Sequence, residues 1–151
     1  MDAFELLKKD HQTVAGIFDE LEAGDAAARR QTFPRLKREL DLHAHVEETI
    51  FYPALKERPE TRELMPEAYA EHNEVKLMLA ELEEQLDAAG EDEWLEQLTE
   101  LRENVEHHVE EEEGEMFPLA QKALGREQVE QLGARMQEAK QQQPKSLGAQ
   151  G

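Results

Sequence analysis

The chain has 151 residues, no cysteine, and 36 acidic against 17 basic side chains, which gives a formal net charge of −19. A single compact domain of this size can bury a core without disulfides, and the lack of cysteine excludes thiolate metal sites. The acidic charge opposes binding to nucleic acid and to anionic membrane surfaces.

The first residues do not form a targeting signal. Residues 1–5 lack the basic and apolar segments of a signal peptide, and no uncharged apolar run is long enough to span a membrane. We therefore predict a cytoplasmic protein that does not bind membranes.

Helix-favouring residues dominate the chain: Glu, Leu, Ala, Gln and Lys are frequent and β-branched residues are few. The first predicted helix covers residues 2–23 and ends near Gly24. Asp25 caps the second helix, which carries residues 33–51, and Pro34 either kinks this helix or marks its first turn.

Two further long helices follow. A connection over residues 58–66, with room for one helical turn, leads to a third helix at about residues 66–88. The fourth helix covers about residues 92–124 and stops at Gly125.

The predicted fold is all-α. Four long helices with short connections indicate an antiparallel up-down-up-down four-helix bundle over residues 1–125. We expect a short C-terminal helix at residues 126–140 and a disordered tail at residues 141–151, where the sequence is polar and contains Pro and Gly.

Each predicted helix has one seam of residues, spaced three and four apart, that faces the bundle core. The seams are Phe4, Leu7, His11, Val14, Phe18 and Leu21; Phe33, Leu36, Leu40, His43, Glu47, Ile50 and Ala54; Met65, Ala68, His72, Val75, Leu79, Leu82 and Leu86; and Trp94, Leu98, Leu101, Val105, His108 and Glu112. Each seam is apolar except for a histidine, which a glutamate joins on the second and fourth helices. Buried carboxylates that face one another destabilise a core unless positive charge lies between them. The seams therefore predict cations in the core.

Six side chains are the predicted metal ligands: His11, His43, Glu47, His72, His108 and Glu112. Histidine and glutamate lie four residues apart in the second helix and again in the fourth, which places each pair on one helix face. These two helices run parallel in an up-down bundle, so the pairs face each other with approximate two-fold symmetry. One arrangement gives two histidines to each of two metal ions, with both glutamates bridging the ions.

An internal repeat supports this arrangement. Residues 43–53 align without gaps on residues 108–118, with histidine, glutamate, an aromatic residue and proline at the same offsets. Imidazole and carboxylate ligands suit iron, manganese or zinc. Six side chains leave open positions on two six-coordinate metals, for an oxo bridge, water or a small ligand, which favours dioxygen-type chemistry over a closed structural zinc site.

These residues resemble the hemerythrin-like, or HHE cation-binding, domain family over about residues 4–124. The resemblance rests on Asp10-His11, the His43/Glu47 unit that ends in Tyr52-Pro53, Glu71-His72, and the His108/Glu112 unit that ends in Phe117-Pro118. It implies a cofactor of two non-haem iron ions, oxo-bridged, that binds dioxygen, nitric oxide or peroxide.

The sequence departs from oxygen-carrying members of this family in two places. Animal hemerythrins have a second histidine one turn after the first on the third helix, where this chain has Lys76. Their last carboxylate lies five residues after its histidine, whereas Glu112 lies four after His108, which makes Glu113 an alternative ligand. The departures favour a sensor, a peroxide-processing protein or a redox-stress protein at least as much as a reversible oxygen carrier.

The ferritin-like di-iron class is the nearest competing interpretation, and it places glutamate three residues before histidine. At that offset the six histidines have Lys8, Leu40, Leu42, Tyr69, Asn104 and Val105. None of these is glutamate, which argues against the ferritin-like class.

The remaining polar residues have simpler interpretations. We expect His45 and His107 at the surface or outside the ligand shell. Glu48 and most of the acidic run at residues 110–113 are expected on solvated faces. Glu115 falls on the seam without an explanation, at the open end of the bundle.

The leading functional hypothesis is a non-haem di-iron protein that binds or reduces a small oxidant, namely dioxygen, nitric oxide or hydrogen peroxide. Any enzymatic activity would be peroxide or oxygen reduction at the metals, because no serine or cysteine nucleophile arrangement and no glycine-rich phosphate loop occurs. An alternative is iron, oxygen or redox sensing, or iron buffering, without turnover, in which the C-terminal segment reports the metal state to a partner. A third is an acidic interaction module whose core polar residues hydrogen-bond only to one another.

Overall fold

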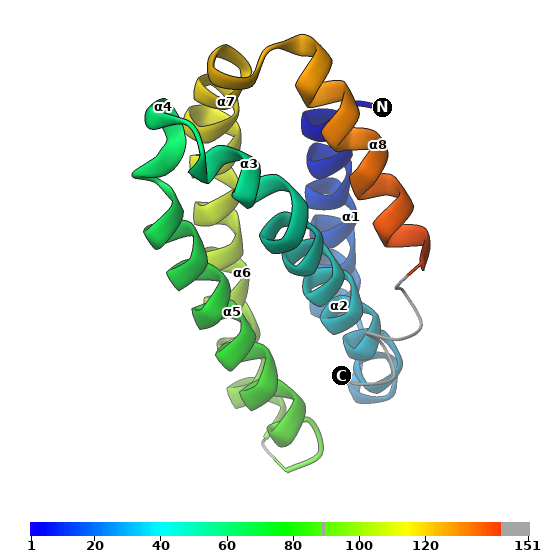
Figure 1. Ribbon diagram of the computed structural model, residues 1–151. Coiled ribbons are helices and arrows are strands. Elements are labelled where there is room, and N and C mark those ends of the chain that lie inside the picture. Colours follow the sequence, from blue (N-terminus) through cyan, green and yellow to red (C-terminus); the bar gives the residue numbers. More distant parts are fainter. Residues whose placement is uncertain (89, 143–151) are drawn as a thin grey trace.

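Helices make up the regular structure of the computed structural model, which describes residues 1–88 and 90–142 (Figure 1). In chain order they are α1 (Ala3–Ala23), α2 (Ala26–Val46), the π-helical turn η1 (Glu47–Phe51), α3 (Tyr52–Lys56), α4 (Pro59–Arg62), α5 (Met65–Gln85), α6 (Glu91–Glu111), the π-helical turn η2 (Glu112–Met116), α7 (Phe117–Leu124) and α8 (Arg126–Gln142). The second rod of the bundle joins α2, η1 and α3, and the fourth joins α6, η2 and α7. With α1 and α5 they form four antiparallel rods, so the predicted all-α bundle is confirmed.

The starts of the first two helices follow from their sequence. The Asp2 side chain accepts a hydrogen bond from the Glu5 amide, and the Glu5 side chain accepts one from the Asp2 amide. The Asp25 side chain accepts a hydrogen bond from the Ala28 amide at the start of α2. Such caps pair amides that the helix itself leaves free, and each contributes about 1 kcal/mol.

Two boundaries differ from the sequence prediction, and the structure decides between the two alternatives for Pro34. Pro34 lies inside α2, so it does not mark the first turn of that helix. The third rod ends at Gln85, about one turn early, because the Leu86 amide bonds to a carbonyl only three residues back. The C-terminal helix α8 continues to Gln142, so the first two residues of the predicted tail are helical, while residues 143–151 lie outside the described part of the chain.

Each of the two compound rods contains a π-helical turn that begins at its seam glutamate. The amide of Tyr52 donates to the carbonyl of Glu47, and the amide of Phe117 donates to the carbonyl of Glu112, five residues back in both cases. A π turn holds one more residue than an α turn, so it shifts the buried face of a helix by one position. The two turns occupy matching places in the internal repeat.

The π turns correct the predicted seams beyond the glutamates. The buried residues that follow are Phe51, Tyr52, Leu55, Met116 and Phe117. The predicted seam residues Ile50 and Ala54 are only partly buried, and Glu115 is exposed. Glu115 therefore needs no special role, because the extra residue in the turn moves it off the core face.

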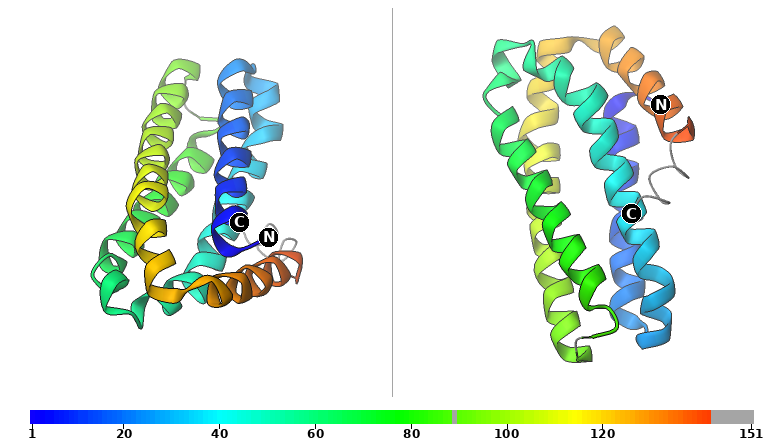
Figure 2. Two further views of the ribbon diagram at one scale, coloured as in Figure 1. Left: turned by 90° about the horizontal axis from the view of Figure 1, so that it is seen from above. Right: turned by 60° about the horizontal axis from the view of Figure 1, so that its bottom comes forward.

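Two apolar clusters make up the core, and the polar seam residues lie between them. One cluster lies toward α3, α7 and α8 and includes Phe4 and Phe51. The other lies toward the connection between α5 and α6 and includes Phe33 and Trp94. Figures 1 and 2 show α8 folding back from the end of α7 to pack along α1.

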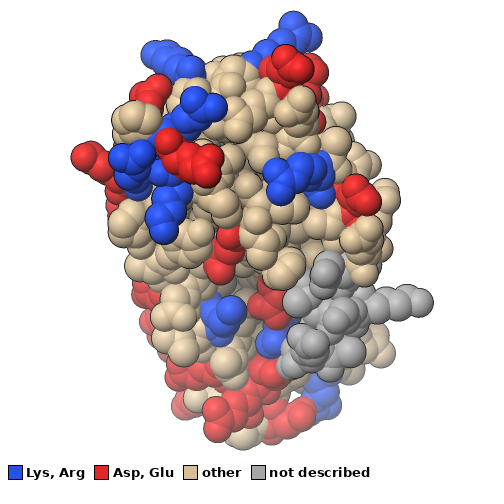
Figure 3. Space-filling model, in the orientation of Figure 1, with Lys and Arg blue, Asp and Glu red and all other residues tan. Residues whose placement is uncertain are grey.

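The surface reflects the excess of acidic residues. On the face shown in Figure 3, acidic side chains gather at the lower end, where α5 leads into α6, and basic side chains lie mainly toward the opposite end. Within the described residues, no helix is both long enough and apolar enough to cross a membrane.

Candidate metal centre

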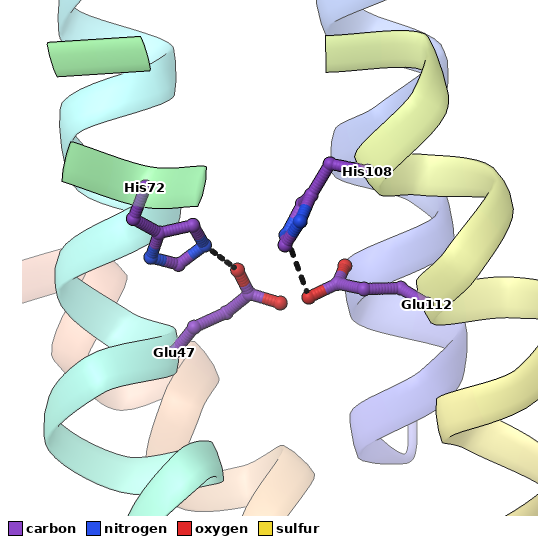
Figure 4. A group of neighbouring side chains, drawn as sticks. All are labelled: Glu47, His72, His108 and Glu112. Carbon is purple, nitrogen blue, oxygen red and sulfur yellow. Dashed lines mark ion pairs between the residues drawn. The ribbon is translucent and has the colours of Figure 1, made fainter. Parts of the chain in front are cut away.

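The six predicted ligand residues meet in the middle of the bundle. The histidine side chains are about nine-tenths buried or more, and neither glutamate has any exposed surface. Figure 4 shows Glu47 and Glu112 reaching toward each other from opposite rods, next to His72 and His108. Each of the four rods contributes one histidine to this cluster.

The histidines form two pairs, here termed the first half (His11 and His43) and the second half (His72 and His108). The ring centroids lie 5.1 Å apart in the first half and 5.0 Å apart in the second. In all four rings Nε2 faces a glutamate. Each half therefore presents two nitrogen atoms of the kind that coordinates metals.

Both glutamates span the two halves. Glu112 places Oε1 3.1 Å from Nε2 of His11 and Oε2 3.2 Å from Nε2 of His108. Glu47 places Oε1 3.3 Å and 2.9 Å from the Nε2 atoms of the remaining histidines, one in each half. Carboxylates in such positions can bridge two cations, one at each half.

Two buried atoms of the cluster lack partners that a cation would supply. His43 Nε2 and Glu47 Oε2 are buried and form no hydrogen bond. His43 Nε2 lies 3.3 Å from Glu47 Oε1, but this contact is an ion pair without hydrogen-bond geometry. Leaving a buried polar atom unpaired costs roughly 1–3 kcal/mol. Imidazole nitrogen and carboxylate oxygen together suit iron, manganese or zinc. The residues present thus fit a metal centre.

The electrostatics of the cluster also favour added positive charge. Burial lowers the pKa of His108, but the hydrogen bond and negative charge of Glu112 outweigh it and raise this pKa to about 10. Burial likewise opposes charge on His43, yet the charge of Glu47 and the hydrogen bond to Asp10 raise the pKa of His43 well above its ordinary value. Protons on the imidazoles balance the carboxylates in the metal-free protein, and metal cations would replace them.

A second ring of four carboxylates contacts the outer nitrogen of each histidine. Measured from Nδ1 to the carboxylate oxygen, the pairs are His11–Glu113 at 2.6 Å, His43–Asp10 at 2.9 Å, His72–Glu48 at 2.7 Å and His108–Glu71 at 2.5 Å. Each carboxylate comes from a neighbouring rod. A histidine that donates its Nδ1 hydrogen in this way keeps Nε2 free for a metal and holds its ring in one orientation.

This outer ring is not among the residues predicted from the sequence. Glu48 was expected on a solvated face, but its side chain is only one-third exposed and accepts the hydrogen bond from His72. Glu113, the alternative ligand, contacts the outer nitrogen of His11 instead of facing the interior. The signal was an acidic residue directly before the histidine of the first and third rods and directly after the seam glutamate of the second and fourth.

Other polar residues lie outside the centre. The His107 side chain is exposed and pairs with Glu111, and His45 is not part of the inner cluster. Tyr69 packs edge-on against Tyr52, with ring centroids 5.4 Å apart. These positions agree with a surface or packing role.

The matching aromatic residues of the internal repeat lie differently on the two halves. Tyr52 is fully buried and stacks on His72, and its hydroxyl donates to Glu112 Oε2 at 2.6 Å. The same hydroxyl lies 3.2 Å and 3.4 Å from the two Nε2 atoms of the second half. Phe117 lies parallel to His11 and offers no polar atom. The second half therefore has an additional oxygen, which the predicted seam omitted because it did not include the π turn.

A small apolar cavity of about 50 Å³ adjoins the histidines. Its lining consists of the four histidines with Val14, Leu40, Ala44, Val75, Val105 and Val109. This volume suits a molecule of a few atoms, and the aliphatic lining favours one of low polarity.

Comparison with known proteins identifies a family for the chain. The family model of the hemerythrin HHE cation binding domain matches residues 2–120. The chain is also similar to a DNA nickase of Nostoc sp. (strain PCC 7120 / SAG 25.82 / UTEX 2576), with 28% identity over 154 residues that cover 99% of this chain and 42% of that protein. The chain thus spans less than half the length of this relative. No solved structure matches it significantly.

Proposed function

Because the chain belongs to the hemerythrin HHE cation-binding domain family, we propose that it holds two iron ions in its core. The proposed ligands are His11, His43, Glu47, His72, His108 and Glu112. One observation carries the proposal: two fully buried carboxylates each lie between histidines of both halves, beside two unpaired ligand atoms. The donor atoms suit iron, manganese or zinc, and the resemblance to hemerythrins favours iron.

The proposed ligand is a small oxidant: dioxygen, nitric oxide or hydrogen peroxide. Bound iron would supply redox and Lewis-acid chemistry. The chain itself orients the imidazoles through the outer carboxylates, limits access through the aliphatic cavity lining, and holds the Tyr52 hydroxyl proton against Glu112. Reduction of peroxide or oxygen is the enzymatic form of this proposal.

Sensing or buffering of iron without turnover is a second candidate. One observation favours it: the C-terminal helix α8 reaches the outer carboxylate ring through a contact between Lys140 and Asp10. In this form, binding or loss of iron would alter the docking of α8, and no substrate would be converted.

The similarity to a DNA nickase does not lead us to propose action on nucleic acid. The chain covers 42% of that relative, so the nicking activity of the whole protein does not transfer to it. The net charge of this chain, −19, and the acidic side chains at the lower end of the face in Figure 3 repel a phosphate backbone. We propose a small-molecule ligand and a cytoplasmic setting, with no nucleic-acid partner.

Metal analysis tests the proposal directly. We expect two iron ions per chain after iron loading, with visible absorption from the loaded centre. Glu112→Ala is expected to lose both ions, because Glu112 offers one oxygen to each half, whereas Glu115→Ala alters an exposed residue of the same π turn and should keep both. An iron content well below two per loaded wild-type chain would overturn the proposal.

Chelation separates the metal centre from a purely hydrogen-bonded core. A ligand present at 100 times its Kd stabilises the folded state by about 2.7 kcal/mol, so two such ions add about 5 kcal/mol. Thermal unfolding of the iron-loaded protein should therefore shift to clearly lower temperature after chelation. An unchanged transition would favour the acidic interaction module instead.

A further inference from the structure

The C-terminal helix reaches the metal centre through a single side chain. Lys140 Nζ donates to Asp10 Oδ1, and Asp10 Oδ2 accepts from His43 Nδ1 at 2.9 Å. A lysine, a carboxylate and a first-half histidine thus form a continuous series of contacts from α8 to the interior. The family match ends at residue 120, so α8 lies outside it.

The packing of α8 fixes the position of Lys140. Val129, Leu132 and Met136 are buried in the apolar cluster that α8 shares with α1 and η1. Gly133 lies so close to the start of α1 that a Cβ there would come within 2.5–2.7 Å of backbone atoms of residues 1–3. The glycine allows α8 to pack closely against the start of α1, and the packed helix places Lys140 next to Asp10.

Asp10 differs from the other three carboxylates of the outer ring. Its side chain is 8% exposed, and those of Glu71, Glu48 and Glu113 are 20%, 33% and 35% exposed. Across residues 1–88 and 90–142, it is the one member of the ring in ion-pair contact with a lysine or arginine. The negative charge of Asp10 is therefore partly neutralised by direct contact with a lysine, a contact that the other three carboxylates lack within the described residues.

This neutralisation acts against a cation at the first half. An outer carboxylate strengthens a histidine ligand by drawing on its Nδ1 hydrogen, and a lysine on that carboxylate weakens this effect. The lysine charge also repels a metal ion directly. Both effects reach the first half, because Asp10 contacts His43 and no histidine of the second half.

We propose that Lys140 is a positioning residue that lowers the metal affinity of the first half through Asp10 and His43, and so couples the docking of α8 to metal occupancy. The inference rests on the proposed function, since it concerns the affinity of the same centre. Coupling between two sites is reciprocal, so a metal ion at the first half loosens α8 by the factor by which Lys140 weakens metal binding. An ion at the first half would then be reported at the C-terminal helix.

Variants that keep one half at a time test the effect on affinity. His108→Ala leaves the first half intact and His43→Ala leaves the second, and each is titrated anaerobically with ferrous iron alone. In the His108→Ala background, Lys140→Gln is expected to tighten iron binding about three- to tenfold, the effect of one unit charge near a divalent ion in a partly solvated site. Lys140→Arg should restore the original affinity. In the His43→Ala background, Lys140→Gln should have a clearly smaller effect, because the route through Asp10 and His43 is absent and only the direct charge repulsion remains.

Arg135→Gln is the matched control, because it removes the same charge from an exposed position of α8. It should leave iron affinity unchanged in both backgrounds. The inference is overturned if Lys140→Gln leaves the iron affinity of the first half unchanged, or if Arg135→Gln changes it equally. Either result leaves the proposed function standing. If the wild type binds no iron, both the inference and the proposed function are overturned.

Hydrogen exchange of the α8 amides measures the reciprocal effect with all ligands in place. Iron loading of the wild type is expected to accelerate exchange at residues 126–142 by about the same three- to tenfold, and this acceleration should disappear in Lys140→Gln. Because this measurement keeps all six proposed ligands, it decides the question even where a single-half variant binds no iron. If the α8 amides of the wild type exchange at the same rate with and without bound iron, the coupling is overturned.

Discussion

The two halves of the metal centre are built alike but have different surroundings. Each has two histidine rings about 5 Å apart with Nε2 atoms facing the shared glutamates. Beside the first half lie the phenyl ring of Phe117 and a buried Asp10 paired with Lys140. Beside the second half lie the Tyr52 hydroxyl and Glu71, which lines a hollow among further glutamates.

An internal repeat can thus keep the positions of the proposed ligands while the charge around them diverges. The backbone device is the same in both compound rods, a π turn that starts at the glutamate. Some residues around the proposed ligands do not follow the repeat. Lys140 makes the surroundings of the first half more positive, and the glutamates near Glu71 make those of the second half more negative. Because negative surroundings stabilise a cation, we expect the second half to bind iron more tightly than the first.

Among changes confined to one half, removing its histidine has the largest expected effect. His43→Ala should lose the ion of the first half and His108→Ala that of the second, leaving one iron per chain in each variant. His43→Ala, which keeps the second half, should then show the tighter binding in an iron titration. His107→Ala changes an exposed neighbour of His108 and should keep both ions. Two ions retained in either ligand variant would contradict the assignment of that histidine.

Removing an outer carboxylate from each half should have an intermediate effect. Asp10→Asn and Glu71→Gln keep the side-chain shape and remove the charge that supports His43 or His108. Loss of such a partner weakens metal binding by about 10- to 100-fold, and we expect the loss only at the half concerned. Stepwise iron titration resolves the two halves, with Glu74→Gln, an exposed position on α5, as the control. Equal weakening of both halves by either change would show that the outer ring acts as one unit.

Much of the fold and the meeting of the six residues could be predicted from sequence, because both depend on helical periodicity. Seam spacing of three and four fixed which faces are buried, and the cost of burying Glu47 and Glu112 pointed to cations. The structure brings these residues together, while their coordination of metal stays a prediction.

The contacts that distinguish the two halves could not be predicted from the sequence. The π turns have no spacing signal of their own, and without them the seam passed through Ile50 and missed Tyr52. Glu48 and the run containing Glu113 were predicted on solvated faces, and no contact was predicted for Asp10 or Glu71. Each of these carboxylates lies one position off a seam, and its histidine partner lies on a neighbouring rod. The contact of Lys140 with Asp10 requires α8 to fold back on α1, which no local pattern specifies.

The smallest expected effect belongs to Tyr52→Phe, which gives the second half the residue type that the repeat has at Phe117. Burial and the charges of both glutamates hold the pKa of Tyr52 well above its ordinary value, so the group that donates to Glu112 is the neutral phenol. Removing this buried donor should lower the free energy of unfolding of the metal-free protein by about 1–3 kcal/mol.

In the iron-loaded protein the loss should be smaller, because an ion at the second half covers the Glu112 oxygen that the hydroxyl otherwise satisfies. Denaturant unfolding with and without iron measures both values, and Tyr69→Phe serves as the control since that tyrosine packs against Tyr52 at the edge of the cluster. Equal losses of unfolding free energy with and without iron would mean that an ion at the second half does not replace the hydrogen bond from the Tyr52 hydroxyl to Glu112. A loss confined to the metal-free state would show that Tyr52 and the second-half ion compete for one carboxylate.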